Sequence, residues 1–75
     1  MDAIDRLNRR LREISQAELA RRTGVPQSAI SLISRRIRRP TLGQCPRLNR
    51  ELGTSYEDWI VVRLIPLPRR RKAAA

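Results

Sequence analysis

The sequence predicts an all-α domain built as a bundle of five helices, and three observations support this prediction. Aliphatic residues recur at intervals of three and four, the spacing of an apolar stripe along a helix. Residues that favour helix starts, Ser15 and Ser55, and glycines that favour helix ends, Gly24 and Gly53, separate the apolar runs. Gly and Pro are few outside the C-terminal part of the chain.

The first helix is expected over residues 2–12. Asp2 and Asp5 suit its positive N-terminal end, and arginines gather toward its C-terminal end. Its apolar stripe consists of Ile4, Leu7 and Leu11.

Residues 15–34 predict two short helices joined by a tight turn. Ser15 can cap the first of them, and Glu18 stands at the capping-box position three residues later. Gly24 ends this helix, because glycine adopts a positive φ without steric cost. The pattern is that of a helix-turn-helix unit.

The second helix of this unit begins at about Gln27. Its inward stripe consists of Ile30, Ile33 and Ile37. Its outward face presents Gln27, Ser28, Ser31, Leu32 and Arg35. Short polar side chains on an exposed helix face can hydrogen-bond base edges in a major groove.

A fourth helix is expected after an arginine-rich loop. Thr41 can cap it, and Leu42, Cys45, Leu48 and Leu52 have the spacing of an inward stripe. Pro46 removes a backbone hydrogen bond if it lies beyond the first turn. The helix therefore either begins late, near Gln44, or bends.

A fifth helix begins after Ser55, and Tyr56, Trp59 and Ile60 are expected to face the core. The apolar residues that follow exceed what one helix face needs, so we expect a partner surface. The predicted dimer interface consists of Trp59, Val62, Leu64 and Ile65. The segment could also be extended, pair as a strand across a dimer, or simply cover the domain's own core.

One domain is predicted over residues 1–65, followed by a basic tail over 66–75 that we expect to be disordered. The chain of 75 residues has a formal net charge of +10, and 16 of its 17 basic residues are arginine. Eight arginines and no Asp or Glu lie between Leu19 and Arg50. Such a field favours a polyanionic partner, namely nucleic acid.

Several functional classes are disfavoured. A single cysteine, Cys45, allows no internal disulfide, and the chain has no histidine for a zinc site. We expect Cys45 to be a small buried side chain, with no metal and no cofactor bound. No apolar run suits a membrane span, and no triad or paired carboxylates suggest an enzyme. A cytoplasmic protein of a bacterial or phage-infected cell is expected.

Three motifs resemble the lambda-repressor-like helix-turn-helix domains, the group that contains phage Cro proteins and repressors. They are SQAELARRTGVPQSAIS, then RRPTL at 38–42, then LNRELGTSYEDWI at 48–60. The resemblance covers about residues 7–60. It implies that the third helix enters the major groove of double-stranded DNA.

The resemblance also implies roles for individual residues. Base edges would be read by Gln27, Ser28, Ser31 and Leu32. Phosphates would be contacted by Gln16, Arg35, Arg36, Arg38 and Arg39. Many relatives carry Glu-Arg-Gly or Glu-Asn-Gly at the end of the third helix, where this chain has Ser34, Arg35 and Arg36. The Glu that can pair with a first-helix Arg and the Gly at the helix end are thus both missing.

The function expected first is that of a Cro-like repressor that binds a palindromic operator as a homodimer. The chain stops where longer repressors continue into a second domain, which favours Cro. An antitoxin or a restriction-modification controller protein would share the same motifs. An RNA-binding protein is the alternative from another class, although single-stranded RNA recognition usually relies on aromatic platforms.

Overall fold

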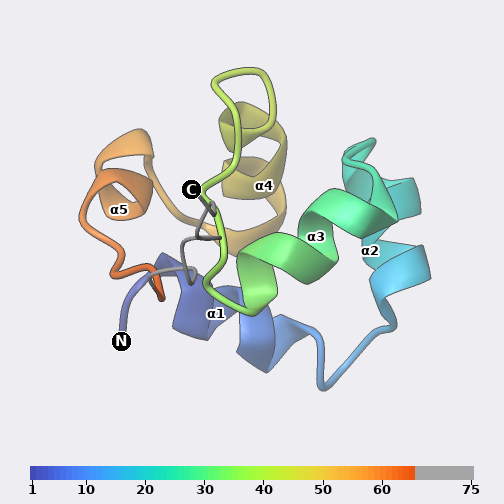
Figure 1. Cartoon of the computed structure of the whole chain (residues 1–75). Helices are drawn as coiled ribbons and strands as arrows, with labels where there is room; N and C mark the ends of the chain where they lie inside the picture. The colour runs from blue at the N-terminus through green and yellow to red at the C-terminus, as the bar shows by residue number, and fades with distance from the viewer. Residues whose placement is uncertain (66–75) are drawn as a thin grey trace, which may run out of the picture.

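Five helices form the domain in the computed structural model, which describes residues 1–65 (Figure 1). Their bounds are α1 Ala3–Arg10, α2 Gln16–Thr23, α3 Gln27–Ser34, α4 Cys45–Leu52 and α5 Tyr56–Ile60. No strand is assigned among the described residues, and the all-α prediction is confirmed. The predicted tail, 66–75, lies outside them.

The starts of α1 and α2 are fixed by side-chain caps. The Asp2 carboxylate accepts a hydrogen bond from the Asp5 N–H at 2.9 Å, and the Asp5 carboxylate accepts one from the Asp2 N–H at 3.0 Å. This reciprocal arrangement is a capping box. At α2, the Ser15 hydroxyl accepts from the Glu18 N–H at 3.0 Å, as expected. The Glu18 carboxylate, however, bonds to arginines of its own helix.

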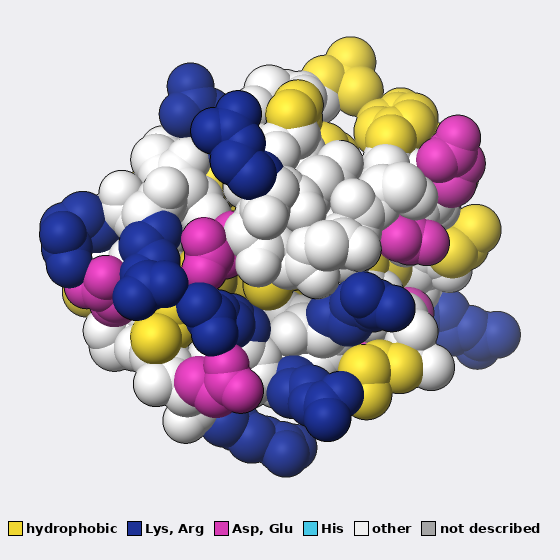
Figure 2. Space-filling view, turned by 180° about the vertical axis from the view of Figure 1, so that it is seen from behind, with side chains coloured by type: hydrophobic (Ala, Val, Ile, Leu, Met, Phe, Trp, Pro, Cys, Tyr) yellow, Lys and Arg dark blue, Asp and Glu magenta, His cyan; other side chains and the backbone are white. Residues whose placement is uncertain are grey.

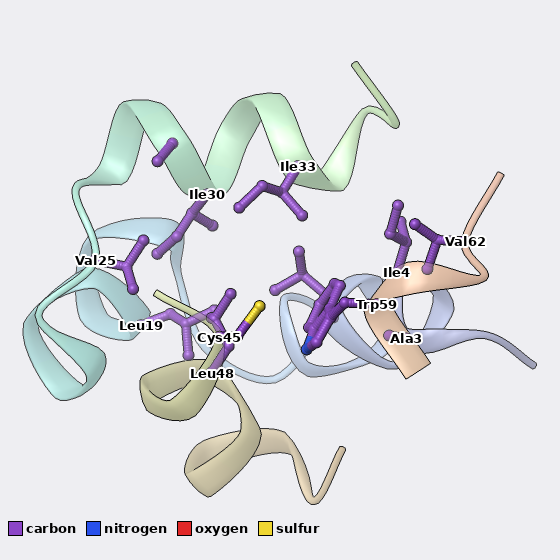
Figure 3. Packing of buried hydrophobic residues seen from close by; sticks show 12 residues of the cluster. Ala3, Ile4, Leu19, Val25, Ile30, Ile33, Cys45, Leu48, Trp59 and Val62 are labelled. Atoms are coloured by element: carbon purple, nitrogen blue, oxygen red, sulfur yellow. The ribbon is translucent and has the colours of Figure 1, made fainter. Parts of the chain in front are cut away.

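The buried side chains form one cluster to which all five helices contribute (Figure 3). Helix α3 packs on α1 and α2, whereas α4 packs on α1, α2 and α5. The cluster consists of Ala3, Ile4, Leu7, Leu19, Val25, Ala29, Ile30, Ile33, Cys45, Leu48, Trp59 and Val62. Helix α3 therefore presents its Ile face to this cluster and leaves its opposite face at the surface.

Helix α4 begins late, and the prediction that Leu42 faces inward is wrong. The helix starts at Cys45, which places Pro46 in the first turn, where a missing N–H leaves no helical bond broken. Residues 41–44 form a separate turn, in which the Gln44 side chain accepts from the Thr41 N–H at 3.0 Å. Leu42 lies on this turn outside the helical stripe and is 73% exposed.

Helix α5 is only five residues long, and it buries one of the three side chains expected in the core. Trp59 is 1% exposed, but Tyr56 and Ile60 are 47% and 48% exposed, so the prediction is wrong for these two. Tyr56 and Ile60 lie four residues apart, on the same side of the helix. The Trp59 indole N–H donates to the Asn49 side chain at 2.8 Å, which fixes the ring against α4.

The segment after α5 returns across the molecule toward the end of α3. Residues 62–65 are assigned to neither helix nor strand. The Val62 side chain is buried in the core, and the Ile65 N–H donates to the Arg36 carbonyl at 2.7 Å. Part of the segment thus covers the domain's own core, one of the alternatives expected from the sequence.

Candidate nucleic-acid interface

The turn between α2 and α3 is held by a buried threonine. The Thr23 hydroxyl donates to the Leu19 carbonyl at 2.8 Å and accepts from the Val25 N–H at 3.1 Å. Gly24 lies between the helices with φ of +75°. Its positive φ turns the chain, and the threonine satisfies the backbone groups that the turn leaves without helical partners.

The four predicted base-reading residues lie on one face of α3. Gln27 and Ser28 are exposed in its first turn, and Ser31 and Leu32 are half-buried one turn later. The buried residues of the helix, Ala29, Ile30 and Ile33, lie on the other side. No acidic residue occurs in α3. This face can therefore offer hydrogen bonds to bases without repelling phosphates.

Gln16 is the first residue of α2, where backbone N–H groups have no helical partners. The residue is half-buried. An amide side chain at a helix N-terminus suits a phosphate oxygen.

In the folded chain, Glu18 and Glu51 bond arginines of residues 19–50, a stretch that itself contains no Asp or Glu. Glu18 bonds Arg21 and Arg22, the latter at 2.9 Å, and these bonds hold the pKa of the Glu18 carboxyl below its ordinary value. Glu51 bonds Arg10 at 2.9 Å and Arg22 at 3.4 Å, which ties α4 to α1 and α2. Figure 2 shows the face opposite that of Figure 1, on which basic and acidic side chains are interspersed.

Two of the arginines that were predicted to contact phosphates bond to other parts of the chain. The Arg36 guanidinium bonds Asp2 and Asp5 of α1, and the bonds with Asp2 hold the pKa of that carboxyl below its ordinary value. The Arg39 guanidinium donates to the carbonyls of Trp59, Ile60 and Val62 at 3.0–3.2 Å. Both groups are occupied within the chain, because long-range partners that no local pattern reveals compete with phosphate.

Arg35 and Arg38 differ from these two because, among residues 1–65, neither side chain bonds a carboxylate or a carbonyl of another helix. Arg35 is exposed, and its only side-chain bond in this part of the chain is a long one, 3.4 Å, to the Ser31 carbonyl. Arg38 is half-buried, and its buried Nε has no hydrogen-bond partner there. They are the cations beside α3 whose guanidinium groups no other helix holds.

At the end of α3, other groups take the place of the Gly and the Glu that many relatives carry there. Arg36 adopts φ of +63°, the left-handed conformation usual for glycine at this position. The Ile37 N–H donates to the Leu32 carbonyl and the Arg36 N–H to the Ile33 carbonyl, both at 3.0 Å, a Schellman motif. In place of a Glu–Arg pair, the Asn8 side chain of α1 donates to the Ser34 carbonyl at 3.1 Å.

No local pattern in the chain indicated the long-range roles of Asn8, Asp2 and Asp5. Asn8 lies 26 residues from Ser34, and Asp2 lies 34 residues from Arg36. From the sequence, the end of α3 was known only to lack the Glu and the Gly of many relatives.

The predicted dimer interface divides into two parts. Trp59 and Val62 are buried within one chain and offer no surface to a second copy, so they are removed from the predicted interface. Ile65 is 56% exposed and Leu64 is half-buried. Val61 and Ile60, close in sequence, are exposed as well.

Among residues 1–65 there is no group of three or more Cys, Asp or Glu side chains that could hold a metal ion. Cys45 is buried, and burial raises the pKa of its thiol. No helix of the described chain has the length and apolar character needed to cross a bilayer.

The helix-turn-helix family model matches residues 6–59. This range includes α2, the turn, α3, the arginine loop, α4 and most of α5. Comparison with curated proteins and with solved structures gives no match. The match extends over more than half of the chain, and together with the geometry of α2 and α3 it shows that the chain belongs to the lambda-repressor-like helix-turn-helix family of DNA-binding regulators.

Proposed function

We propose that this chain is a Cro-like repressor that binds a palindromic operator as a homodimer. The observation that carries the proposal is the outward face of α3, where exposed polar side chains stand without acids and next to the un-neutralised Arg35. Phosphate contacts position such a protein, and base contacts specify its site.

In this proposal Gln27 and Ser28 read bases near the start of α3, and Ser31 and Leu32 contact bases one turn later. A Gln amide can bond adenine N6 and N7 together, and a Leu side chain can pack on a thymine methyl group. Gln16, Arg35 and Arg38 contact phosphates on either side of the reading helix.

Selection of binding sites from a random duplex pool tests this proposal. We expect a palindrome whose half-sites are about one helical turn, roughly 34 Å, apart. Duplex DNA should bind more tightly than RNA of equal length. Recovered sites without symmetry would exclude the homodimer, and a preference for RNA would exclude the repressor.

Two substitutions separate reading from positioning. Gln27→Ala should weaken operator binding by about 1–3 kcal/mol and relax the preference at one base pair. Arg38→Ala should weaken all duplexes alike and reduce the salt slope by about one. Arg50→Ala is the matched control, because it removes an exposed arginine from α4, which does not pack on α3. The docking is wrong if Arg38→Ala changes base preference and Gln27→Ala does not.

The dimer is tested by sedimentation with and without Ile65→Asp. We expect this change to dissociate the dimer, because it places a charge on the exposed apolar segment after α5. Leu42→Asp introduces the same charge at an exposed aliphatic residue elsewhere on the surface and should leave the mass unchanged. Equal effects of the two substitutions would show that net charge, rather than this surface, controls association.

A further inference from the structure

Three distant parts of the chain meet at Arg36. Its guanidinium donates to the Asp2 carboxylate at 2.9 and 3.1 Å, and to Asp5 at 3.0 Å. It also donates to the Arg63 carbonyl at 2.9 Å. The backbone carbonyl of the same residue accepts from the Ile65 N–H at 2.7 Å. The start of α1, the end of α3 and the C-terminal segment are therefore joined through one residue.

The planar guanidinium is suited to this role. It has five N–H donors in a fixed fork, so one side chain can bond two carboxylates and a carbonyl at the same time. A lysine at the same place would keep the charge but not the fork. The backbone of Arg36 is fixed as well, because its left-handed φ is set by the two hydrogen bonds that close the end of α3.

The C-terminal segment has few other attachments on this side of the molecule. A surface hollow of about 470 Å³ is lined by Asp2, Arg36, Val61, Arg63, Leu64 and Ile65. Val61 and Ile65 are exposed at its rim. Beyond the buried Val62 side chain, residues 63–65 are held by the two bonds made by Arg36 and by Leu64, which packs half-buried against the core cluster.

We propose that Arg36 is a positioning residue that ties the C-terminal segment to the exit of the reading helix. Its link to DNA recognition rests on the proposed function, because the loop that leaves α3 through Arg36 carries Arg38. Holding Arg36 between Asp2, Asp5 and Arg63 fixes the direction of that loop. Releasing the segment should leave α3 folded but let the phosphate-contacting loop move.

Amide hydrogen exchange in the DNA-free chain tests the tie directly. In Arg36→Gly we expect exchange at the Ile65 amide to accelerate about tenfold, since a hydrogen bond from a charged group is lost beside it. The Ile33 amide, inside α3, should change by less than about threefold, since glycine suits the left-handed backbone. Arg36→Lys should accelerate Ile65 exchange to an intermediate degree.

The proposal is overturned if Ile65 exchange in Arg36→Gly is unchanged. If Ile33 exchange rises by the same factor, the double substitution Asp2→Asn with Asp5→Asn distinguishes loss of the tie from a general loss of stability. That pair removes the carboxylates and leaves the α3 backbone intact, so Ile65 should still exchange faster than Ile33. Equal acceleration of both amides in the pair would show a general loss of stability and would also overturn the proposal.

A DNA titration tests whether the tie affects operator affinity. We expect Arg36→Gly to lower operator affinity about threefold to tenfold with an unchanged salt slope, because a positioning residue releases no counterion on binding. A slope reduced by about one would instead make Arg36 a phosphate contact and overturn the assignment. The exchange experiment contains no DNA, so its result is independent of whether the operator proposal holds.

Discussion

The ends of α2 and α4 differ from the end of α3 in how they reach the same backbone conformation. Gly24 and Gly53 take φ of +75° and +71°, whereas Arg36 takes +63° with a full side chain. A left-handed residue other than glycine carries about 1–2 kcal/mol of steric strain. At Arg36 the strain is offset by bonds to Asp2, Asp5 and Arg63. A helix end can thus be fixed either by a residue that tolerates the geometry or by partners that hold it.

The largest effect is expected for Gly24→Ala. The substitution adds left-handed strain, and its new Cβ would lie 2.7 Å from the Arg47 guanidinium. We expect a loss of about 2 kcal/mol of unfolding free energy, which is about 8–16 °C in Tm for a domain of this size. Thermal unfolding measures it. In an Arg47→Ala background the loss should shrink toward the strain alone, and an unchanged loss would rule out the Arg47 contact as a contributor.

Gly53→Ala separates strain from contact. Its φ is nearly the same, but no atom lies within 4 Å of an added Cβ. We expect a loss of about 1 kcal/mol from the backbone alone. Denaturant titration of both alanine variants compares them. If Gly53→Ala destabilises as much as Gly24→Ala, crowding by Arg47 has no energetic role.

Asp2→Asn tests the partners that hold Arg36. The change weakens a partly exposed ion pair and should lower stability by about 0.5 kcal/mol at neutral pH. The pKa of Asp2 lies below its ordinary value in the folded chain, mainly because Arg36 bonds its carboxylate. The unfolded state therefore binds this proton first as the pH falls, so the contribution is present above the ordinary pKa and is lost below the folded one.

The measurement is the stability of wild type and Asp2→Asn between neutral pH and about pH 3, a window that spans the ordinary carboxyl pKa. The difference between the two proteins should be largest near neutrality and should shrink as Asp2 is protonated. A difference that does not depend on pH would show that the carboxylate charge is not what stabilises Arg36.

The smallest net effect is expected for Arg36→Gly. Relief of about 1 kcal/mol of backbone strain opposes the loss of hydrogen bonds of similar worth, so unfolding free energy should stay within about 0.5 kcal/mol of wild type. Chemical denaturation checks this balance. If Arg36→Gly strongly stabilises the fold, the ion pairs of Arg36 contribute little. If it strongly destabilises the fold, these ion pairs contribute more free energy than the backbone strain costs.

The helix starts and ends that depend on nearby residues were predictable from the sequence. Ser15, Gly24, Gly53 and the two isoleucines Ile30 and Ile33 act through neighbours three or four residues away, and the structure places them as expected. Ile37, predicted on the same stripe, lies beyond the end of α3 and is only half-buried. Leu42 and Tyr56 show the limit of this reasoning. Leu42 lies before the first residue of α4, so its spacing from Cys45 does not place it on the buried stripe. Tyr56 lies within α5 and is still 47% exposed, so a helical position alone does not bury a side chain.

The site was less predictable than the fold, because side-chain partners can be distant in sequence. Gln27, Ser28, Ser31 and Leu32 share one face, as the helical period requires. Arg36 and Arg39 have the same local sequence character as Arg38, yet only these two meet acids or carbonyls from other helices. Local charge counts cannot distinguish an arginine left for phosphate from one used to hold the fold together.

The buried threonine of the helix-turn-helix has a consequence for the kinetics of recognition. Thr23 makes both of its bonds within the free chain, so the angle between α2 and α3 does not depend on a ligand. Association then loses little conformational entropy in this unit, because no loop must be ordered before the bases are contacted. Encounter with DNA should be governed by electrostatic attraction and orientation rather than by a folding step.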